Sequence, residues 1–141
     1  MISKLRFRHL YGEASKSKYE LVKPTSSMCE SNLIKGNSLY LGVSWFSSGG
    51  GSLAILPNNG QRKLEASFPM IKGHSSAVLD FDFYPFDDNF VATASEDTTI
   101  KLWQIPQDFT EDLMTPLVSL DGHGKKVNYH FIVCLNFFEK G

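Results

Sequence analysis

The sequence predicts an all-β protein made of antiparallel sheets. Apolar and polar residues alternate in several short segments, which is the pattern of half-buried strands. Turn-forming Gly, Pro, Asn and Asp residues separate these segments, and nothing in the 141 residues sustains a helical period. The hydrophobic fraction of 42% is close to the globular average, so the chain has enough apolar side chains to bury a core.

The first expected strand, SKLRFRHL at residues 3–10, has one cationic face. Lys4, Arg6 and Arg8 alternate with other side chains, so all three point the same way from a strand. The polar, serine-containing stretch at residues 12–31 follows and is expected to be an irregular connection.

A β-hairpin with a glycine-rich loop is predicted next. SLYLGVSWF (38–46) is rich in aromatic and β-branched residues, SSGGGS turns the chain, and SLAILP (52–57) returns it. Pro57 ends the second strand because it has no N–H for the ladder. A turn at residues 58–63 and a short edge strand, ASFPMI at residues 66–71, complete this part.

The clearest alternation lies in AVLDFDFYP, residues 77–85. One face is expected to carry Val78, Asp80 and Asp82, and the other Leu79, Phe81 and Phe83. Three further strands are predicted, at residues 90–95, 99–106 and 116–120. The first two are joined by a tight turn at 96–98, and the last two by a polar loop at 107–115 that has room for one turn of helix.

A repeated unit is suggested by two Gly-His pairs. Gly73-His74 and Gly122-His123 stand 49 residues apart, and each pair is followed within a few residues by Val. Four-stranded repeats of the GH...WD type recur every ~40 to 45 residues, and the polar loop accounts for the excess here. The expected organisation is a strand with a divergent first unit at 1–71, a regular unit at 72–121, and the start of another at 122–141.

The charge and the cysteine content limit which classes of function the sequence favours. The net charge of −1 and the 21% of charged residues do not favour nucleic-acid binding or disorder. Residues 1–35 nevertheless carry +4 against −5 for the remainder, and such a segment either steers an acidic partner or is simply solvated. Cys29 and Cys134 fit no metal-ligand spacing. With no signal peptide and no membrane-length apolar run, an intracellular protein with reduced thiols is expected.

The segment from Gly73 to Ile105, GHSSAVLDFDFYPFDDNFVATASEDTTIKLWQI, resembles one WD repeat, with Gln104 where Asp usually follows Trp. SKLRFRHLYG, SSGGGSLAILP and WQIP together resemble the N-terminal part of coronins, which are actin-binding proteins built on a seven-bladed β-propeller. The resemblance covers residues 3 to 127, and PFDDNFVATAS is similar to the long coronins with two propellers. It implies a partial WD-repeat β-propeller of four-stranded antiparallel blades, with an incomplete ring.

After Val127 the sequence departs from the family pattern, because NYHFIVCLNFFEKG does not look like a further blade. We therefore expect a product truncated after about one and a half blades. With the neighbouring blades missing, the apolar positions Leu79, Phe81, Val91, Ile100 and Leu102 are expected to be partly exposed. A chain of this kind is predicted to be marginally stable and prone to associate.

The resemblance also implies a structural hydrogen-bond network made by His74, Ser95 (or Thr93), Asp97 and Trp103. Imidazole, hydroxyl and indole groups supply three donors, and a buried carboxylate needs donors. Leaving the Asp97 carboxylate unpaired would cost on the order of 3 to 5 kcal/mol. The network is expected to fix loop, turn and strand in one geometry.

The rival interpretation of these residues is a hydrolase charge relay made by His74, Ser95 and Asp97. A hydrolase serine usually stands on a strained G-x-S-x-G elbow with oxyanion donors nearby, whereas Ser95 follows ATA at a plain strand end. SSGGGS lacks the Lys-Ser/Thr of a phosphate-binding loop, and the histidines fit blade markers better than metal ligands. We expect no catalysis, no cofactor and no metal.

The expected partners follow from the resemblance, since coronins bind filamentous actin through basic residues. Arg6, Arg8 and Lys23 are the candidate contacts, and Lys23 of YELVK stands where the family has an Arg. Lysine keeps the charge but cannot form the two-point contact of a guanidinium. A cytoplasmic, cytoskeleton-associated scaffold that binds actin and other cytoskeletal or trafficking proteins is expected. The alternative is a WD-repeat adaptor in vesicle traffic or protein turnover without actin contact.

Overall fold

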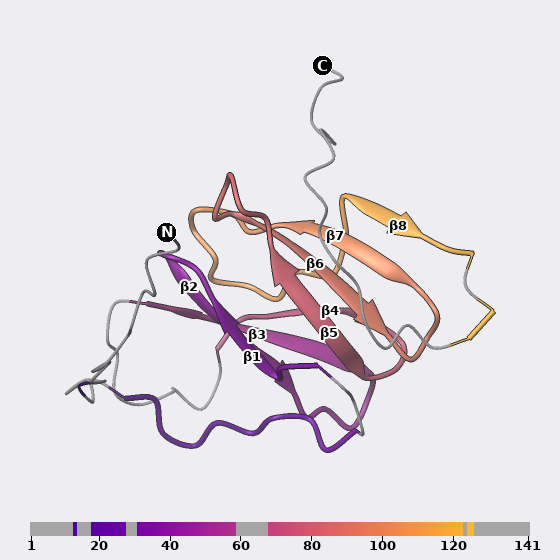
Figure 1. Ribbon diagram of the computed structural model, residues 1–141, viewed down its shortest axis with the longest axis horizontal. Coiled ribbons are helices and arrows are strands. Elements are labelled where there is room, and N and C mark those ends of the chain that lie inside the picture. The colour runs from indigo at the N-terminus through magenta and orange to yellow at the C-terminus, as the bar shows by residue number, and fades with distance from the viewer. Residues whose placement is uncertain (1–12, 14–17, 28–30, 59–67, 123, 126–141) are drawn as a thin grey trace, which may run out of the picture.

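Two four-stranded antiparallel sheets make up the fold in a computed structural model of the chain (Figure 1). The structure describes residues 13, 18–27, 31–58, 68–122 and 124–125. Each sheet is a simple meander in which strands adjacent in sequence are hydrogen-bonded neighbours. The all-β prediction is therefore confirmed, and the described residues contain no helix.

The first sheet has the order β1-β2-β3-β4, and its strands are β1 (Ile34–Gly36), β2 (Tyr40–Trp45), β3 (Gly51–Pro57) and β4 (Met70–His74). The β2–β3 hairpin with its glycine-rich loop is as predicted, and β3 ends at Pro57. The three-residue strand β1 was not anticipated, because it is too short to show an alternating pattern. β4 continues to His74, so the predicted division at residue 71/72 falls inside a strand.

The second sheet has the order β5-β6-β7-β8, and its strands are β5 (Val78–Phe83), β6 (Phe90–Ser95), β7 (Ile100–Gln104) and β8 (Val118–Leu120). All four lie within the predicted strand segments. The register of β5 against β6 shifts between Val78 and Asp80, so the simple two-faced alternation predicted for β5 does not hold along its whole length.

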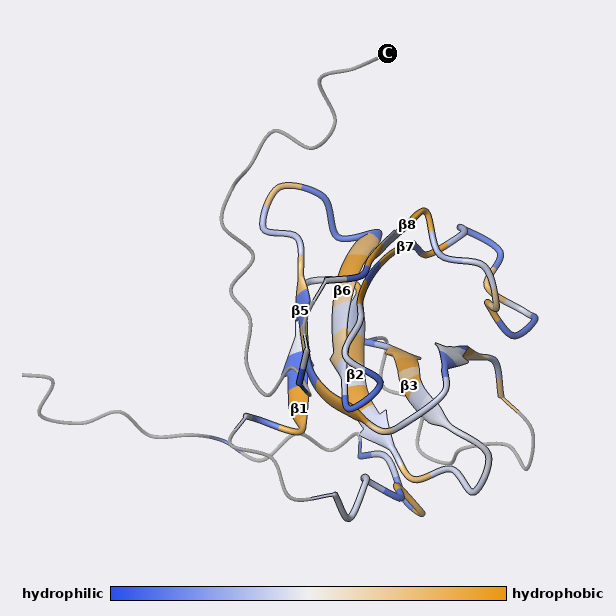
Figure 2. Ribbon diagram, turned by 90° about the vertical axis from the view of Figure 1, so that its right-hand side faces the viewer, coloured by the Kyte–Doolittle hydropathy of each residue, from blue (hydrophilic) through white to orange (hydrophobic). Residues whose placement is uncertain are grey.

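The main core contains buried side chains of β3 and β4 from the first sheet and of β5, β6 and β7 from the second, and β5 is the strand that packs most closely on the first sheet, against β1, β2 and β3. Figure 2 shows hydrophobic residues concentrated on strands such as β3 and β6. Leu79, Phe81 and Val91 are almost completely buried, which corrects the prediction that they would be partly exposed. Ile100 and Leu102 are half-buried, because they lie on the outer part of the second sheet.

Polar contacts also join the first strand of each sheet. The Lys35 ammonium on β1 forms a 2.9 Å ion pair with the Asp80 carboxylate on β5, and the Asp80 side chain is fully buried. The Asn37 amide donates to the Asp88 carbonyl oxygen over 2.9 Å. The sequence predicted that Asp80 and Asp82 lie on one face of the strand. The carboxylate of Asp80 can be buried on this face because Lys35 of the other sheet supplies a cation that pairs with it.

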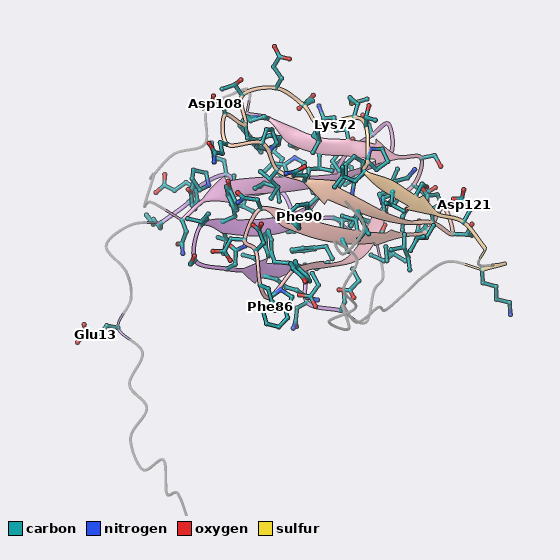
Figure 3. All side chains as sticks on the ribbon, turned by 90° about the horizontal axis from the view of Figure 1, so that it is seen from above. Glu13, Lys72, Phe86, Phe90, Asp108 and Asp121 are labelled. Carbon is teal, nitrogen blue, oxygen red and sulfur yellow. The ribbon has the colours of Figure 1, made fainter. Side chains whose placement is uncertain are left out.

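The loop at residues 107–115 returns from the second sheet to the outer edge of the first. It contains no helical turn; instead Leu113 forms a parallel bridge with Ile71 of β4. The Leu113 N–H donates to the Met70 carbonyl and the Leu113 carbonyl accepts from the Lys72 N–H, both over 2.9 Å. Figure 3 shows Asp108 and Lys72 along one edge of the molecule and Phe86 along the opposite edge.

Several sequence predictions fall outside the described residues. These are the cationic strand with Arg6 and Arg8, both cysteines, and nearly all of residues 122–141. Within the part of the chain that the structure describes, no helix has the length and apolar character needed to span a membrane.

Candidate functional site: a hydrogen-bonded junction between the sheets

The network predicted around Asp97 lies at the junction of the two sheets. His74 is the last residue of β4 in the first sheet, whereas Asp97 lies in the turn between β6 and β7 of the second. The His74 Nδ1 atom is 2.9 Å from the Asp97 Oδ2 atom, and both side chains are almost completely buried. The network therefore connects the two sheets.

Four hydrogen bonds satisfy the Asp97 carboxylate. Besides the His74 ring, its donors are the Ser75 N–H at 3.0 Å, the Thr99 N–H at 3.0 Å and the Thr99 hydroxyl at 2.7 Å. Thr99 was not predicted, although an Asp whose carboxylate binds the backbone two residues later is a recognisable turn pattern. The residue between them, Thr98, has a φ of 72°, which is a strained conformation for a β-branched side chain.

On its other side the imidazole of His74 contacts Thr93, and Thr93 contacts Trp103. The His74 Nε2 atom lies 2.6 Å from the Thr93 hydroxyl, which also accepts a 2.8 Å hydrogen bond from the Trp103 indole N–H. The prediction that the indole donates directly to Asp97 is wrong. Instead a chain runs from Trp103 through Thr93 and His74 to Asp97.

The direction of the protons in this chain follows from the charge state of His74. Burial lowers the pKa of His74 below 6.5, outweighing the opposing effect of the Asp97 hydrogen bond and charge, so the ring is neutral near pH 7. A neutral ring that donates from Nδ1 to Asp97 must accept at Nε2. The Thr93 hydroxyl therefore donates to His74 and accepts from Trp103, and every buried donor in the chain has a partner.

Ser95 lies beside this chain but is not part of it. Its hydroxyl donates to the Ser76 carbonyl over 2.9 Å and accepts from the Asp97 N–H over 3.1 Å. Thr93, which the sequence offered as the alternative, is the hydroxyl that His74 and Trp103 share. Ser95 instead holds the turn of Asp97 against the connection between β4 and β5.

The charge of Asp97 is strongly stabilised. Burial alone would raise the pKa of this carboxyl, but the hydrogen bonds from Thr99 and His74 outweigh burial and lower the pKa from 3.8 to about 2. Asp97 is therefore an anion at neutral pH. A permanently charged acceptor with four donors is suited to holding structure, and it has no spare capacity to take a proton from a nucleophile.

A glycine is required beside the indole of Trp103. A Cβ atom at Gly73 would lie 2.6 Å from the Trp103 Cη2 atom and 3.0 Å from the Met114 carbonyl oxygen. Any larger residue would push β4 away from the second sheet. This contact explains why Gly precedes His74 at the junction.

The described residues around this network form neither a metal cluster nor a charge relay. Among the residues that the structure describes, no three His, Cys, Asp or Glu side chains gather at metal-binding distance. The hydroxyl of Ser95 contacts backbone atoms and does not contact the imidazole of His74 in the arrangement of a charge relay. The geometry thus supports a structural network rather than a reaction centre.

The candidate partner residue Lys23 is exposed, and its backbone is held by β2. The Phe46 N–H donates to the Lys23 carbonyl over 2.9 Å, and the Thr25 N–H donates to the Ser44 carbonyl over 2.8 Å. Within the described part of the chain, the ammonium of Lys23 has no ion-pair partner. The structure does not test the other two candidates, Arg6 and Arg8.

Two protein families match this chain, one in its first part and one in its second. A domain of unknown function, DUF1899, matches residues 2–63, and the WD domain, G-beta repeat, matches residues 64–104. The second match begins before β4 and ends with β7, so it spans the junction between the sheets. The two antiparallel sheets, the hydrogen-bonded junction and this match define a segment of a WD-repeat β-propeller.

The relatives identify the family. The chain is 36% identical over 135 residues to "Coronin-like protein crn1" of Schizosaccharomyces pombe, covering 89% of the chain and 22% of that relative. It is 40% identical over 118 residues to "Coronin-A" of Dictyostelium discoideum, covering 82% of the chain and 26% of that relative. It belongs to the coronin family and matches the N-terminal region of its members.

A solved structure agrees with this assignment. The WD40 domain of Toxoplasma gondii coronin superimposes with a TM-score of 0.77 at 35% identity, covering 84% of this chain and 31% of that one. The resemblance to a partial coronin propeller is therefore confirmed. The chain spans only about a quarter or less of the curated relatives described above.

Proposed function

We propose that this chain is a non-catalytic, coronin-type scaffold that binds actin filaments and helps to organise the actin cytoskeleton in the cytoplasm. Membership of the coronin family supports the class of function. The observation that carries the contact itself is the exposed Lys23 ammonium on a segment whose backbone is fixed against β2.

A fixed cation is a better recognition element than one on a free chain. Ordering a flexible segment on binding costs conformational entropy, and the hydrogen bonds from Phe46 and Thr25 already restrict this segment. Two residues earlier, Leu21 has a φ of 64° and is 69% exposed. An apolar side chain displayed from a strained backbone position beside a cation supports an interface there.

The network at the junction supports the non-catalytic part of the proposal. His74 is neutral and uses both ring nitrogens, and Asp97 is ionised and saturated with donors. Neither residue is available to activate Ser95. We infer that the binding surface carries the function and that the network keeps this surface in shape.

Cosedimentation of the 141-residue chain with actin filaments tests the proposal. We expect Lys23→Glu to weaken binding about tenfold, because it replaces attraction by repulsion, and added salt to weaken the binding of the unchanged chain. Lys23→Arg should strengthen binding, because the guanidinium can contact a carboxylate at two points. Arg8→Glu should add to the effect of Lys23→Glu if both cations face the filament.

The matched control is Lys125→Glu, which makes the same charge change at an exposed position near the end of the described chain. It should bind like the unchanged protein. Equal losses for Lys23→Glu and Lys125→Glu would show an unspecific charge effect. No sedimentation of a folded chain would reject actin binding and favour the alternative of a WD-repeat adaptor.

A further inference from the structure

A small groove lies directly above the junction of the two sheets. It has a volume of about 180 Å³ and is formed by three separate parts of the chain together with Glu96. These parts are the segment at residues 25–27, the β2–β3 hairpin from Trp45 to Gly50, and the β4–β5 connection at residues 75–77.

The wall formed by the β4–β5 connection is held rigidly by the turn of Asp97. The Asp97 carboxylate accepts from the Ser75 N–H, the Ser95 hydroxyl donates to the Ser76 carbonyl, and the Glu96 N–H donates to the Ala77 carbonyl. Consecutive residues of this connection are thus fixed by consecutive residues of the turn. The groove is preorganised, which lowers the entropic cost of filling it.

The glycine triplet closes the hairpin onto this connection. A Cβ atom at Gly51 would overlap the Ser76 carbonyl oxygen and lie 2.9 Å from the Val78 backbone nitrogen. Only glycine permits this approach, and it brings Phe46 to one side of the groove and Glu96 to another. The SSGGGS segment, which is not a phosphate-binding loop, therefore shapes a recess.

The size of the groove restricts its ligand. Its volume corresponds to about six water molecules at ~30 Å³ each. Sites for cofactors and other small molecules usually enclose roughly 300 to 1,000 Å³. The groove is therefore suited to the end of a single side chain, presented by a larger partner.

The chemistry of the lining favours a cation. Glu96 is the one charged side chain among the described lining residues, and the remainder are chiefly hydroxyl-bearing and aromatic. The ionised carboxylate of Asp97 adds a second negative charge immediately behind Ser75. Phe46, a residue that is 54% exposed, offers an aromatic face on which a planar cation can stack.

We propose that this groove binds one arginine side chain from an extended segment of a protein partner. The guanidinium pairs with the Glu96 carboxylate, stacks on Phe46 and donates to the surrounding hydroxyl groups. Arginine fits better than lysine because its flat, forked head combines stacking with two-point hydrogen bonding. The inference does not rest on actin binding, since Glu96 and Lys23 have opposite charges and would select different groups.

NMR titration of the ¹⁵N-labelled 141-residue chain tests the proposal. The ligands are short peptides of glycine and serine whose termini are blocked and uncharged, and only the central residue differs between them. We expect the arginine peptide to shift the backbone amides of Ser75, Ser76 and Glu96. The lysine peptide should bind about threefold more weakly. The citrulline peptide, which keeps the shape but not the charge, should bind at least about tenfold more weakly.

Variants of the chain identify the contacts. Glu96→Gln should lower affinity for the arginine peptide about tenfold and Phe46→Leu about threefold. Glu111→Gln is the matched control, because it makes the same change at an exposed residue outside the groove. The side chain of Glu96 has no hydrogen bond to the described residues, so Glu96→Gln should fold normally.

Three results would overturn the proposal. One is equal shifts with the arginine and citrulline peptides on the unchanged chain, which would show that charge is not recognised. Another is an arginine affinity that Glu96→Gln leaves unaltered. The third is that no peptide shifts these amides up to its solubility limit.

Discussion

The imidazole of His74 and the carboxylate of Asp97 are separated by 2.9 Å, yet they belong to different sheets. No backbone ladder joins β4 to β5, so this contact links the consecutive sheets together with the shared core and the Lys35–Asp80 ion pair. Its strength should therefore contribute to how cooperatively the two sheets unfold.

Removing the charge of Asp97 should destabilise the junction. We expect Asp97→Asn to lower the free energy of unfolding by about 2 kcal/mol or more, because the amide loses charge-assisted bonds to His74, Ser75 and Thr99. Urea unfolding followed by tryptophan fluorescence measures the loss. The control Asp108→Asn makes the same change at an exposed site and should cost less than about 0.5 kcal/mol.

Thr93 and Ser95 should respond differently to loss of the hydroxyl. Thr93→Val keeps the shape but leaves the Trp103 N–H and the His74 Nε2 atom unpaired, at a cost of about 2 to 4 kcal/mol. Ser95→Ala should cost about 1 kcal/mol, because the backbone groups of Ser76 and Asp97 that lose their bonds belong to half-buried residues. A larger loss for Ser95→Ala, measured by the same unfolding assay, would contradict the hydrogen-bond chain.

The stability of the fold should decrease in acid in two stages. The pKa of His74 is lower in the folded chain than its ordinary 6.5, so protonation favours the unfolded chain as the pH falls below about 6.5. The pKa of Asp97 falls from 3.8 to about 2 on folding, and its contribution of about 2 kcal/mol is lost as the pH falls from about 4 toward 2.

Urea unfolding at a series of pH values from neutral to about 2 checks this dependence. The variant Asp97→Asn should retain a decline below pH 6.5 but lose most of the second stage. A stability that rises as the pH falls through this range would show that the sign is wrong for both groups.

The three glycines of the β2–β3 hairpin offer a test of close packing. Gly51→Ala should destabilise the chain by about 3 kcal/mol or prevent folding, because the new methyl overlaps the backbone of the β4–β5 connection. Gly49→Ala adds the same methyl where nothing lies within 4 Å, and it should change stability by less than about 0.5 kcal/mol. Comparable thermal unfolding of the two variants would contradict the close contact.

Much of the fold could be predicted because its signals are local. Strand β6 coincides with the predicted FVATAS, since its apolar run is bounded by turn residues on both sides. Strand β1 could not be found, because three residues carry no period. The pairing of the loop at 107–115 with β4 could not be predicted either, since it depends on the path by which the chain returns from the second sheet to the first.

The connections within the site were harder to predict than the residue types that form it. His74, Asp97 and Trp103 belong to one chain of hydrogen bonds that passes through Thr93, but Thr93 and Ser95 lie two residues apart on the same strand and look alike in sequence. The register decides between them: Val91 stands opposite Trp103 and Thr93 opposite Lys101, which leaves Ser95 at the turn. Register is a property of the paired strands and cannot be read from the sequence of β6 alone.

The bridge between Leu113 and Ile71 has a consequence for how this molecule behaves at high concentration. An outermost strand normally presents free N–H and C=O groups that can template pairing with a strand from another molecule. Here the backbone of Leu113 forms hydrogen bonds with the Met70 carbonyl and the Lys72 N–H on the outer side of β4. The chain thus protects this edge against intermolecular β-sheet extension with a piece of its own backbone.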